Sequence, residues 1–192
     1  ASYMFYNARN LRQVDLSNFD TRNVIDMSFM FYNCKTIKSL DFSNFNTEKL
    51  EKMNSMFYFC SSIEHLDFSS FDTSKITNMS YAFSNLATIT SLDLSKFNTE
   101  NVMIMSNMFY HSTKLQYLNL KSFNTKKVND FSYMFGSCEN LLSLDLSHFD
   151  TSKAKQMEYM FQFCGQLRSL DISKVDTSFV TDMTGIFYNC SQ

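Results

Sequence analysis

The hydrophobic and polar residues of this chain follow one pattern that returns every 26 residues from end to end. One polar position of the pattern recurs, without insertion or deletion, at Asp15, Asp41, Asp67, Asp93, Asn119, Asp145 and Asp171. A fixed period of this length is typical of a solenoid, in which each repeat forms one coil and packs on its neighbours. We therefore predict that residues 1–192 form a single solenoid array of about seven repeats, with no internal linker.

Two elements are predicted within each repeat. In the first full copy, apolar Val14 and Leu16 alternate with Asp15, which is the pattern of a short half-buried strand. Equivalent strands of stacked coils would pair in parallel. Later in the same copy, five residues have the three- and four-residue spacing of one helical face: Val24, Met27, Met30, Phe31 and Cys34. The pattern predicts an α/β repeat solenoid with one short parallel strand and one short, Met-rich helix per repeat.

Several columns of similar residues are predicted to stabilise the array. The most constant column should be the most buried on the helical side: Phe5, Phe31, Phe57, Phe83, Phe109, Phe135, Phe161 and Phe187. The five cysteines share a repeat position that is elsewhere Ala8, Leu86 or Ser112, so we interpret them as small core side chains and not as disulfides or metal ligands. The invariant threonines beginning with Thr21 follow Asp or Asn, and we expect these residues to bond backbone amides at a corner of the coil.

The full repeat, L-x-x-L-D-L-S-x-F-D-T-x-x-V-x-x-M-x-x-M-F-x-x-C, resembles that of the BspA-like leucine-rich-repeat surface proteins of bacteria. The similarity covers all 192 residues in seven near-identical copies. It implies a right-handed solenoid, an extracellular or cell-surface location, and adhesion or binding to proteins of a host or a neighbouring cell. The column of Thr is a departure, because many leucine-rich repeats have a ladder of Asn.

The two ends of the chain lie at the same phase of the repeat. The sequence opens with ASYMFYNA and closes with TGIFYNC. We therefore expect the chain to be a fragment of a longer protein. Neither end has the polar cap that covers the core of a solenoid, so exposed residues such as Phe5, Leu11, Ile186 and Phe187 should favour end-to-end self-association.

Composition argues against several classes of function. A net charge of −2 with no basic stripe disfavours nucleic-acid binding, and no run of apolar residues is long enough to span a membrane. The three histidines, His65, His111 and His148, occupy three different repeat positions, so no catalytic set emerges from the period. We expect a protein that is not an enzyme and that needs no cofactor.

The column of acidic residues on the outward face of the predicted strands has two interpretations. Parallel strands lie about 4.8 Å apart, so successive carboxylates should repel one another and resist ionisation. Serine hydroxyls or turn amides could satisfy them. Alternatively, the first four could form a cation-binding ladder, with calcium as the most plausible ion: Asp15, Asp41, Asp67 and Asp93.

A partner-binding site is predicted where the outward row of the strands departs from its Ser, Asp, Ser consensus. The fifth repeat replaces all three residues with Tyr117, Asn119 and Lys121, and His65 is another bulky variant in this row. Drift at weakly constrained positions would also explain these changes. Tyrosine is frequent among interface hot spots, so we expect a contact surface for an extracellular protein here, with the tyrosines beyond the strands as the second choice. The rival hypothesis is a structural spacer or stalk with no ligand of its own.

Overall fold

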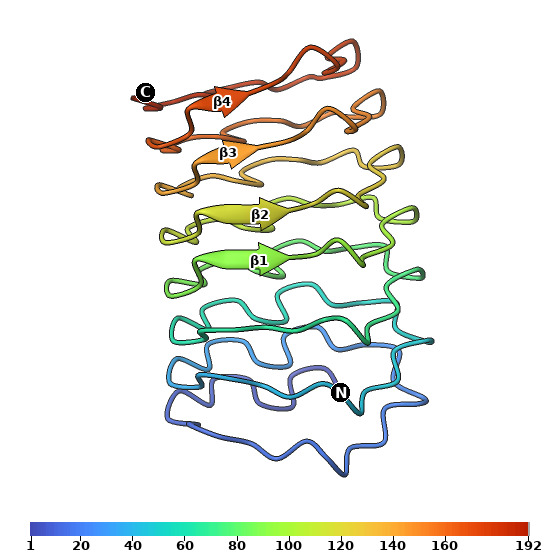
Figure 1. Cartoon of the computed structure of the whole chain (residues 1–192). Coiled ribbons are helices and arrows are strands. Elements are labelled where there is room, and N and C mark those ends of the chain that lie inside the picture. The colour runs from blue at the N-terminus through green and yellow to red at the C-terminus, as the bar shows by residue number, and fades with distance from the viewer. Residues whose placement is uncertain (192) are drawn as a thin grey trace.

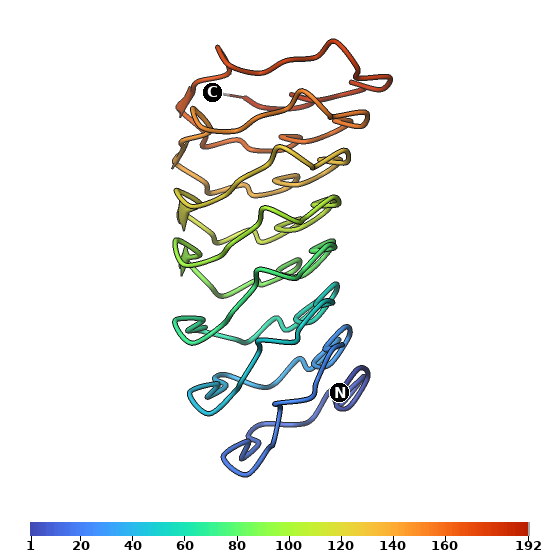
Figure 2. The same cartoon turned by 90° about the vertical axis from the view of Figure 1, so that its right-hand side faces the viewer.

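The computed structural model describes residues 1–191 as a stack of flat coils, one for each repeat (Figure 1). We number the coils one to seven from Leu11, so that coil five spans residues 115–140. The strands lie along one side of the stack, and the remainder of every coil returns along the other side (Figure 2). The predicted repeat solenoid is confirmed.

Short parallel strands form in the last four coils. They are β1 (Ser91–Asp93), β2 (Tyr117–Asn119), β3 (Ser143–Leu144) and β4 (Ser169–Leu170). β1 pairs with β2 and β3 pairs with β4, always between residues one repeat apart. The predicted parallel register is therefore confirmed for these coils, whereas the equivalent residues of coils one to three are extended without forming a strand.

Coils two and three differ from the later coils in one inward side chain. These coils carry Phe42 and Phe68 at the position that is Leu94 in coil four. The Phe42 and Phe68 rings are buried and stack with centroids 6.1 Å apart. The two coils still share a backbone bond here, since the Glu64 N–H donates to the Lys38 carbonyl at 3.0 Å.

The predicted helix is wrong, because residues 1–191 contain no helix. Residues 27–34 and their equivalents instead form a run of overlapping reverse turns. The Met30 N–H donates to the Met27 carbonyl at 3.2 Å, and the Cys34 N–H donates to the Phe31 carbonyl at 3.1 Å. The φ angles of Phe29 and Asn33 are 58° and 60°. A residue in the left-handed region cannot continue a right-handed helix, so each turn ends before a helix can propagate.

The N–H groups between these turn bonds point along the stack. Phe29, Phe31 and Asn33 donate to the carbonyls of Asn54, Met56 and Tyr58 in the next coil, at 3.1, 3.0 and 2.7 Å. Single-residue parallel bridges between positions such as Asp26 and Lys52 add a further link between coils. Since no helix is present, no helical segment of the described residues is long and apolar enough to cross a membrane.

The invariant Phe column is buried as predicted, except in the first and last copies, where Phe5 is partly buried and Phe187 is exposed. Phe31, Phe57, Phe83, Phe109 and Phe135 are completely buried. The Phe83 ring stacks with that of Phe57 at 6.0 Å and with that of Phe109 at 5.9 Å between centroids. The core is therefore a continuous stack of rings that passes through every coil, and it has no single centre.

The cysteine column is also internal, which confirms its interpretation as a set of core side chains. All five thiols are free, and Cys34, Cys60, Cys138 and Cys164 are buried. The Cys60 thiol donates to the Phe31 carbonyl of the preceding coil at 3.0 Å, and Ser112 makes the same bond to Phe83 at 2.9 Å. Burial raises the pKa of Cys34 to about 11 and that of Cys164 to about 12.

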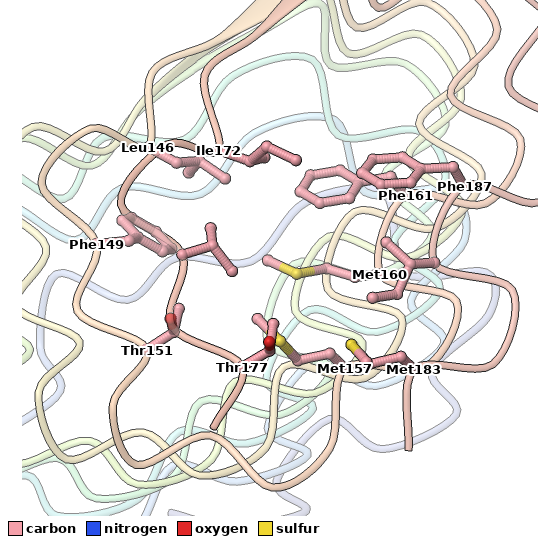
Figure 3. A pocket seen from close by; sticks show the side chains of 12 residues that line it. Leu146, Phe149, Thr151, Met157, Met160, Phe161, Ile172, Thr177, Met183 and Phe187 are labelled. Atoms are coloured by element: carbon pink, nitrogen blue, oxygen red, sulfur yellow. The ribbon is translucent and has the colours of Figure 1, made fainter. Parts of the chain in front are cut away.

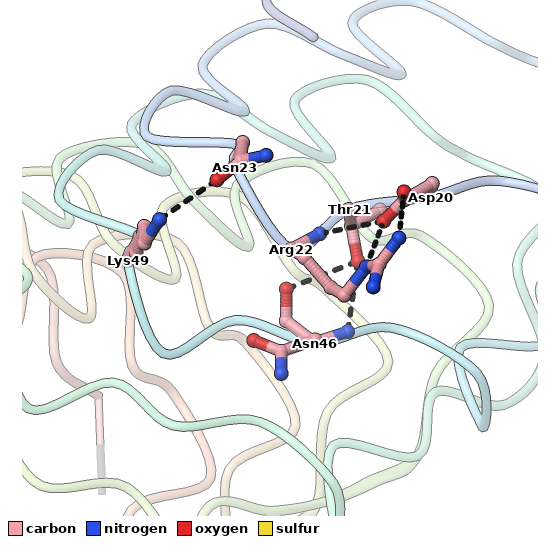
Figure 4. A network of polar contacts seen from close by, with 6 residues as sticks. All are labelled: Asp20, Thr21, Arg22, Asn23, Asn46 and Lys49. Carbon is pink, nitrogen blue, oxygen red and sulfur yellow. Dashed lines mark hydrogen bonds and ion pairs between the residues drawn. The ribbon is translucent and has the colours of Figure 1, made fainter.

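The corner threonines join neighbouring coils. The Thr21 hydroxyl accepts a hydrogen bond from the Asn46 N–H at 2.8 Å and donates to the Asn46 carbonyl at 3.0 Å (Figure 4). Asp20 makes the predicted local bond, because its Oδ1 accepts the Arg22 N–H at 3.2 Å. The corner column is therefore satisfied within the fold, by a local bond from Asp or Asn and by a bond between coils from Thr.

Candidate functional site

The outward side of the strands is hollowed into a shallow groove. We call this surface the strand face; it consists of the outward residues of β1–β4 and their equivalents in coils one to three. Three hollows of about 740, 430 and 370 Å³ adjoin along it. The first and second share His65, and the second and third share Ser91 and Asp93. The three hollows of the groove therefore follow one another along the strand face from coil one to coil six.

The acidic row of the strand face is held by local turns. Oδ1 of Asp67, Asp93 and Asp145 accepts the N–H of the serine two residues later, at 2.8, 2.9 and 3.0 Å. Asn119 makes the same bond to the Lys121 N–H at 3.3 Å. This arrangement agrees with the expectation that nearby serines satisfy the carboxylates.

Hydrogen bonding also decides the ionisation of this row. We expected neighbouring carboxylates to resist ionisation, but the bonds from Ser69 and Ser95 hold the pKa of Asp67 and Asp93 below the ordinary value. For Asp67 the neighbouring charge of Asp41 does raise the pKa, yet it is the smallest of the contributions. The expected resistance is therefore wrong for these carboxyls, which are ionised at neutral pH.

The four candidates for a cation ladder do not converge on a point. Asp15, Asp41, Asp67 and Asp93 are all exposed and follow one another along the stack. Within residues 1–191, no three Asp, Glu, His or Cys side chains are grouped so that they could share one metal ion.

The predicted partner-binding residues lie in or beside the groove. Tyr117 and Asn119 line the third hollow together with Asp93 and Asp145 of the neighbouring coils. The Tyr117 side chain is 57% exposed. Lys121 is exposed next to this hollow, and its charge contributes to the lowered pKa of Asp93. His65 lies two coils away from Tyr117, and it lines the first and second hollows instead of the third.

Three charged residues at the first hollow were not predicted as part of the site. Arg12, Lys38 and Glu64 share one repeat position and line this hollow. Lys38 Nζ lies 2.9 Å from Glu64 Oε1, and both side chains are exposed. The signal was present in the sequence as three charged residues at equal spacing, immediately before the row that includes His65.

The tyrosines beyond the strands are engaged with one another. Nine of the ten tyrosines occupy two repeat positions in the turn segment, and Tyr117 is the exception. Tyr6 stacks on Tyr32 with centroids 4.7 Å apart, and Tyr133 stacks on Tyr159 at 5.0 Å. One of these two positions lies at the left-handed residue of the turn and not on a helix, as the φ of 55° at Tyr133 shows. Many of the ring faces on this side are therefore already covered.

Comparisons with known proteins agree with the repeat pattern. The model of a family described as "Mycoplasma protein of unknown function, DUF285" matches residues 1–117 and 77–192. The chain is similar in structure to a leucine-rich repeat protein from Bacteroides ovatus, with a TM-score of 0.61 and 15% sequence identity. That similarity covers 90% of this chain but only 40% of the Bacteroides protein, and at this identity it establishes the fold alone. A search of curated proteins finds no match.

Proposed function

We propose that this chain, which belongs to the DUF285 family of BspA-like leucine-rich repeats, is a protein-binding array that recognises its partner with the strand face. The observation that carries the proposal is the position of the irregular residues. His65, Tyr117, Asn119 and Lys121 replace the serine or aspartate of most coils, and all four lie in or beside one groove.

The fold itself does not require these four replacements. Their side chains point away from the core, and most other coils fold with Ser or Asp at the same positions. An exposed aromatic ring such as Tyr117 adds contact area that becomes useful only when a partner covers it. Tyr is enriched among the residues that dominate binding energy at interfaces.

The location and the partner class follow from the resemblance to bacterial surface proteins. We infer that the array belongs to a bacterial cell-surface or extracellular protein that binds a host or neighbouring-cell protein in adhesion. Leucine-rich-repeat arrays are generally not enzymes, and we propose neither a catalytic role nor a cofactor for this one.

The uniformity of the repeats supports a second candidate, a spacer or stalk that presents another domain. A spacer should tolerate both the loss of a coil and any outward substitution. A binder should depend on particular outward residues. The two candidates therefore differ in how they respond to a variant in which only the strand face is changed.

The test is a consensus-face variant that carries His65→Ser, Tyr117→Ser, Asn119→Asp and Lys121→Ser. A displayed library of random peptides is selected on the wild-type array, and each selected peptide is then measured against both proteins. We expect peptides that bind the wild type and lose about tenfold or more in affinity on the variant, a loss of about 1.4 kcal/mol. A library that yields only peptides binding both proteins equally would contradict binding at this face and support the spacer.

A further inference from the structure

We infer that the third hollow of the strand face receives a cationic side chain, a guanidinium or an ammonium group, from an extended segment of the protein partner. The inference rests on the proposed function and narrows it, because it names the chemistry that this part of the groove recognises. It follows from the ring of Tyr117, the two carboxylates that line the same hollow and the charge distribution along the groove.

Tyr117 differs from the other tyrosines in having a free ring. No aromatic ring of residues 1–191 stacks on Tyr117, whereas Tyr6 and Tyr133 each stack on the tyrosine of the next coil. The free face of an aromatic ring attracts a cation through the negative charge density above the ring plane. Tyr117 is therefore the tyrosine of this chain that is best placed to accept a charged group from outside.

Two carboxylates line the same hollow as the ring and flank Asn119, two residues along the strand from Tyr117. Asp93 precedes Asn119 by one coil and Asp145 follows it by one coil, so the two acidic groups lie on either side of a neutral amide. Each uses Oδ1 for its local turn, and among the described residues neither Oδ2 accepts a hydrogen bond or lies within 4.0 Å of a basic group. Each carboxylate thus keeps one free acceptor for a donor from a partner.

Charge varies along the groove, and Lys121 is exposed beside this hollow. The first hollow contains Arg12 and Lys38 as well as Glu64, and the second contains Lys96 together with Asp67 and Asp93. The third is lined by two acidic residues and by no basic residue. The bonds from Ser95 and Ser147 hold the pKa of Asp93 and Asp145 below the ordinary value, so both groups are negative at neutral pH. A partner segment with a cation here would be complementary to the groove.

Asn119 interrupts the acidic row between Asp93 and Asp145, where an aspartate would place a third carboxylate. The amide keeps the same bond to the backbone while removing this charge. Arginine is the favoured ligand of such a site, because its planar group can stack on a ring and donate several hydrogen bonds at once.

The probes for the test are a tetra-arginine peptide and the matched tetra-citrulline peptide, which has the same shape without the charge. Each is titrated into the 192-residue array while the backbone amide resonances are followed by NMR. We expect saturable shifts centred on β1, β2 and β3 with the arginine peptide only. Tyr117→Ser should weaken this binding about fivefold, within the range of a cation–π contact, whereas Tyr117→Phe should retain it.

A matched control separates this hollow from general attraction to the acidic row. Asp145→Asn should weaken binding of the arginine peptide, whereas Asp15→Asn, which removes the same charge in coil one, should not. Shifts spread evenly along the row, equal binding of both peptides, or no effect of Tyr117→Ser would overturn the inference. Library peptides that need the strand face but carry no Arg or Lys would overturn it too, while leaving the proposed function intact.

Discussion

Side-chain oxygens at two positions of each coil, and at a third position in coils one, three, five and seven, accept bonds that regular secondary structure would otherwise supply. In coil one, Oδ1 of Asp15, Asp20 and Asp26 accepts the N–H two residues later, at 2.9, 3.2 and 2.8 Å. Asp and Asn offer the same oxygen and can therefore replace each other at these positions. The turns of this glycine-poor and proline-free chain depend on these local bonds.

These bonds predict a loss of stability in acid. The pKa of Asp20 is lowered to about 2 by hydrogen bonds from Arg22, and that of Asp15 is lowered by bonds from Ser17. An unfolded aspartate titrates near 3.9, so the stabilisation is fully present above about pH 4 and is lost as the pH falls toward the folded pKa. Thermal unfolding should show a falling midpoint between about pH 4 and pH 2.

The control replaces several of the exposed aspartates by asparagine, for example Asp15, Asp41 and Asp67. Asparagine keeps the local bond, as Asn119 shows, but it does not titrate in this range. The variant should therefore match the wild type near pH 6 and lose less of its midpoint in acid. An equal loss in both proteins would assign the acid sensitivity to other groups.

The cysteine column predicts slow labelling of the thiols in the native state and different stability costs for two replacements of Cys138. Buried thiols with a raised pKa should react with iodoacetamide much more slowly in the native state than in urea, and half-buried Cys190 should react first. Cys138→Ser should cost little, because Ser112 already bonds the carbonyl of its neighbouring coil. Cys138→Val should cost about 1 kcal/mol more, since the Phe109 carbonyl loses its donor. Rapid labelling of all five thiols, followed by mass spectrometry, would contradict their burial.

At the scale of elements, consecutive turns produce the same inward spacing as a helix. Met27, Met30, Phe31 and Cys34 all face the core, as an amphipathic helix would place them. The intervening residues Phe29 and Asn33 have positive φ, which lets their N–H groups reach the next coil. Hydrophobic spacing alone cannot separate the two structures. Asn is frequent at the repeat position of Asn33. Because Asn tolerates the left-handed region, this preference was the signal in the sequence for turns instead of a helix.

Substitution of His111 distinguishes the two structures directly. This exposed residue has a φ of 58°, so a β-branched Val should destabilise the array by about 1–2 kcal/mol, and Gly should be neutral or stabilising. A helix would give the opposite order, because Gly there costs about 1 kcal/mol and Val costs less. Urea unfolding of the two variants decides between the turn and the helix.

At the scale of the whole molecule, stability is distributed through contacts between neighbouring coils. Phe83→Ala removes a fully buried ring from the middle of the stack and should cost about 3–5 kcal/mol. Phe187→Ala at the last coil, where the side chain is 49% exposed, should cost clearly less. Equilibrium unfolding in urea measures both. Equal effects would mean that burial along the stack does not determine stability.

The two ends of the array are complementary, and we propose that 192-residue chains associate head to tail. Inside the stack, the Phe161 N–H donates to the Ile186 carbonyl of the next coil at 2.9 Å. The Phe187 N–H at one end and the Met4 carbonyl at the other have no backbone partner among the described residues. At the last coil, Ile172, Met183 and Phe187 line an apolar cavity of about 190 Å³ (Figure 3).

Sedimentation over a range of concentrations tests this association. We expect oligomers that grow with concentration and that disappear in a Phe187→Glu variant, because a buried charge would oppose the stacking of ends. The control is Ile25→Glu, which places the same charge at an exposed position on the side of the stack. This variant should leave assembly unchanged. A strictly monomeric wild type at its highest soluble concentration would contradict end-to-end stacking.

The sequence by itself determined the solenoid, the parallel register and the buried columns, because an uninterrupted 26-residue period places equivalent residues of successive coils on top of one another. It also located the irregular residues around Tyr117. Only the tertiary structure decided that the inward residues of the second element lie on turns and not on a helix, because the N–H groups of that element bond to the next coil. The same holds for the groove, since Arg12, His65 and Tyr117 are far apart in the chain and share a surface only when the coils are stacked.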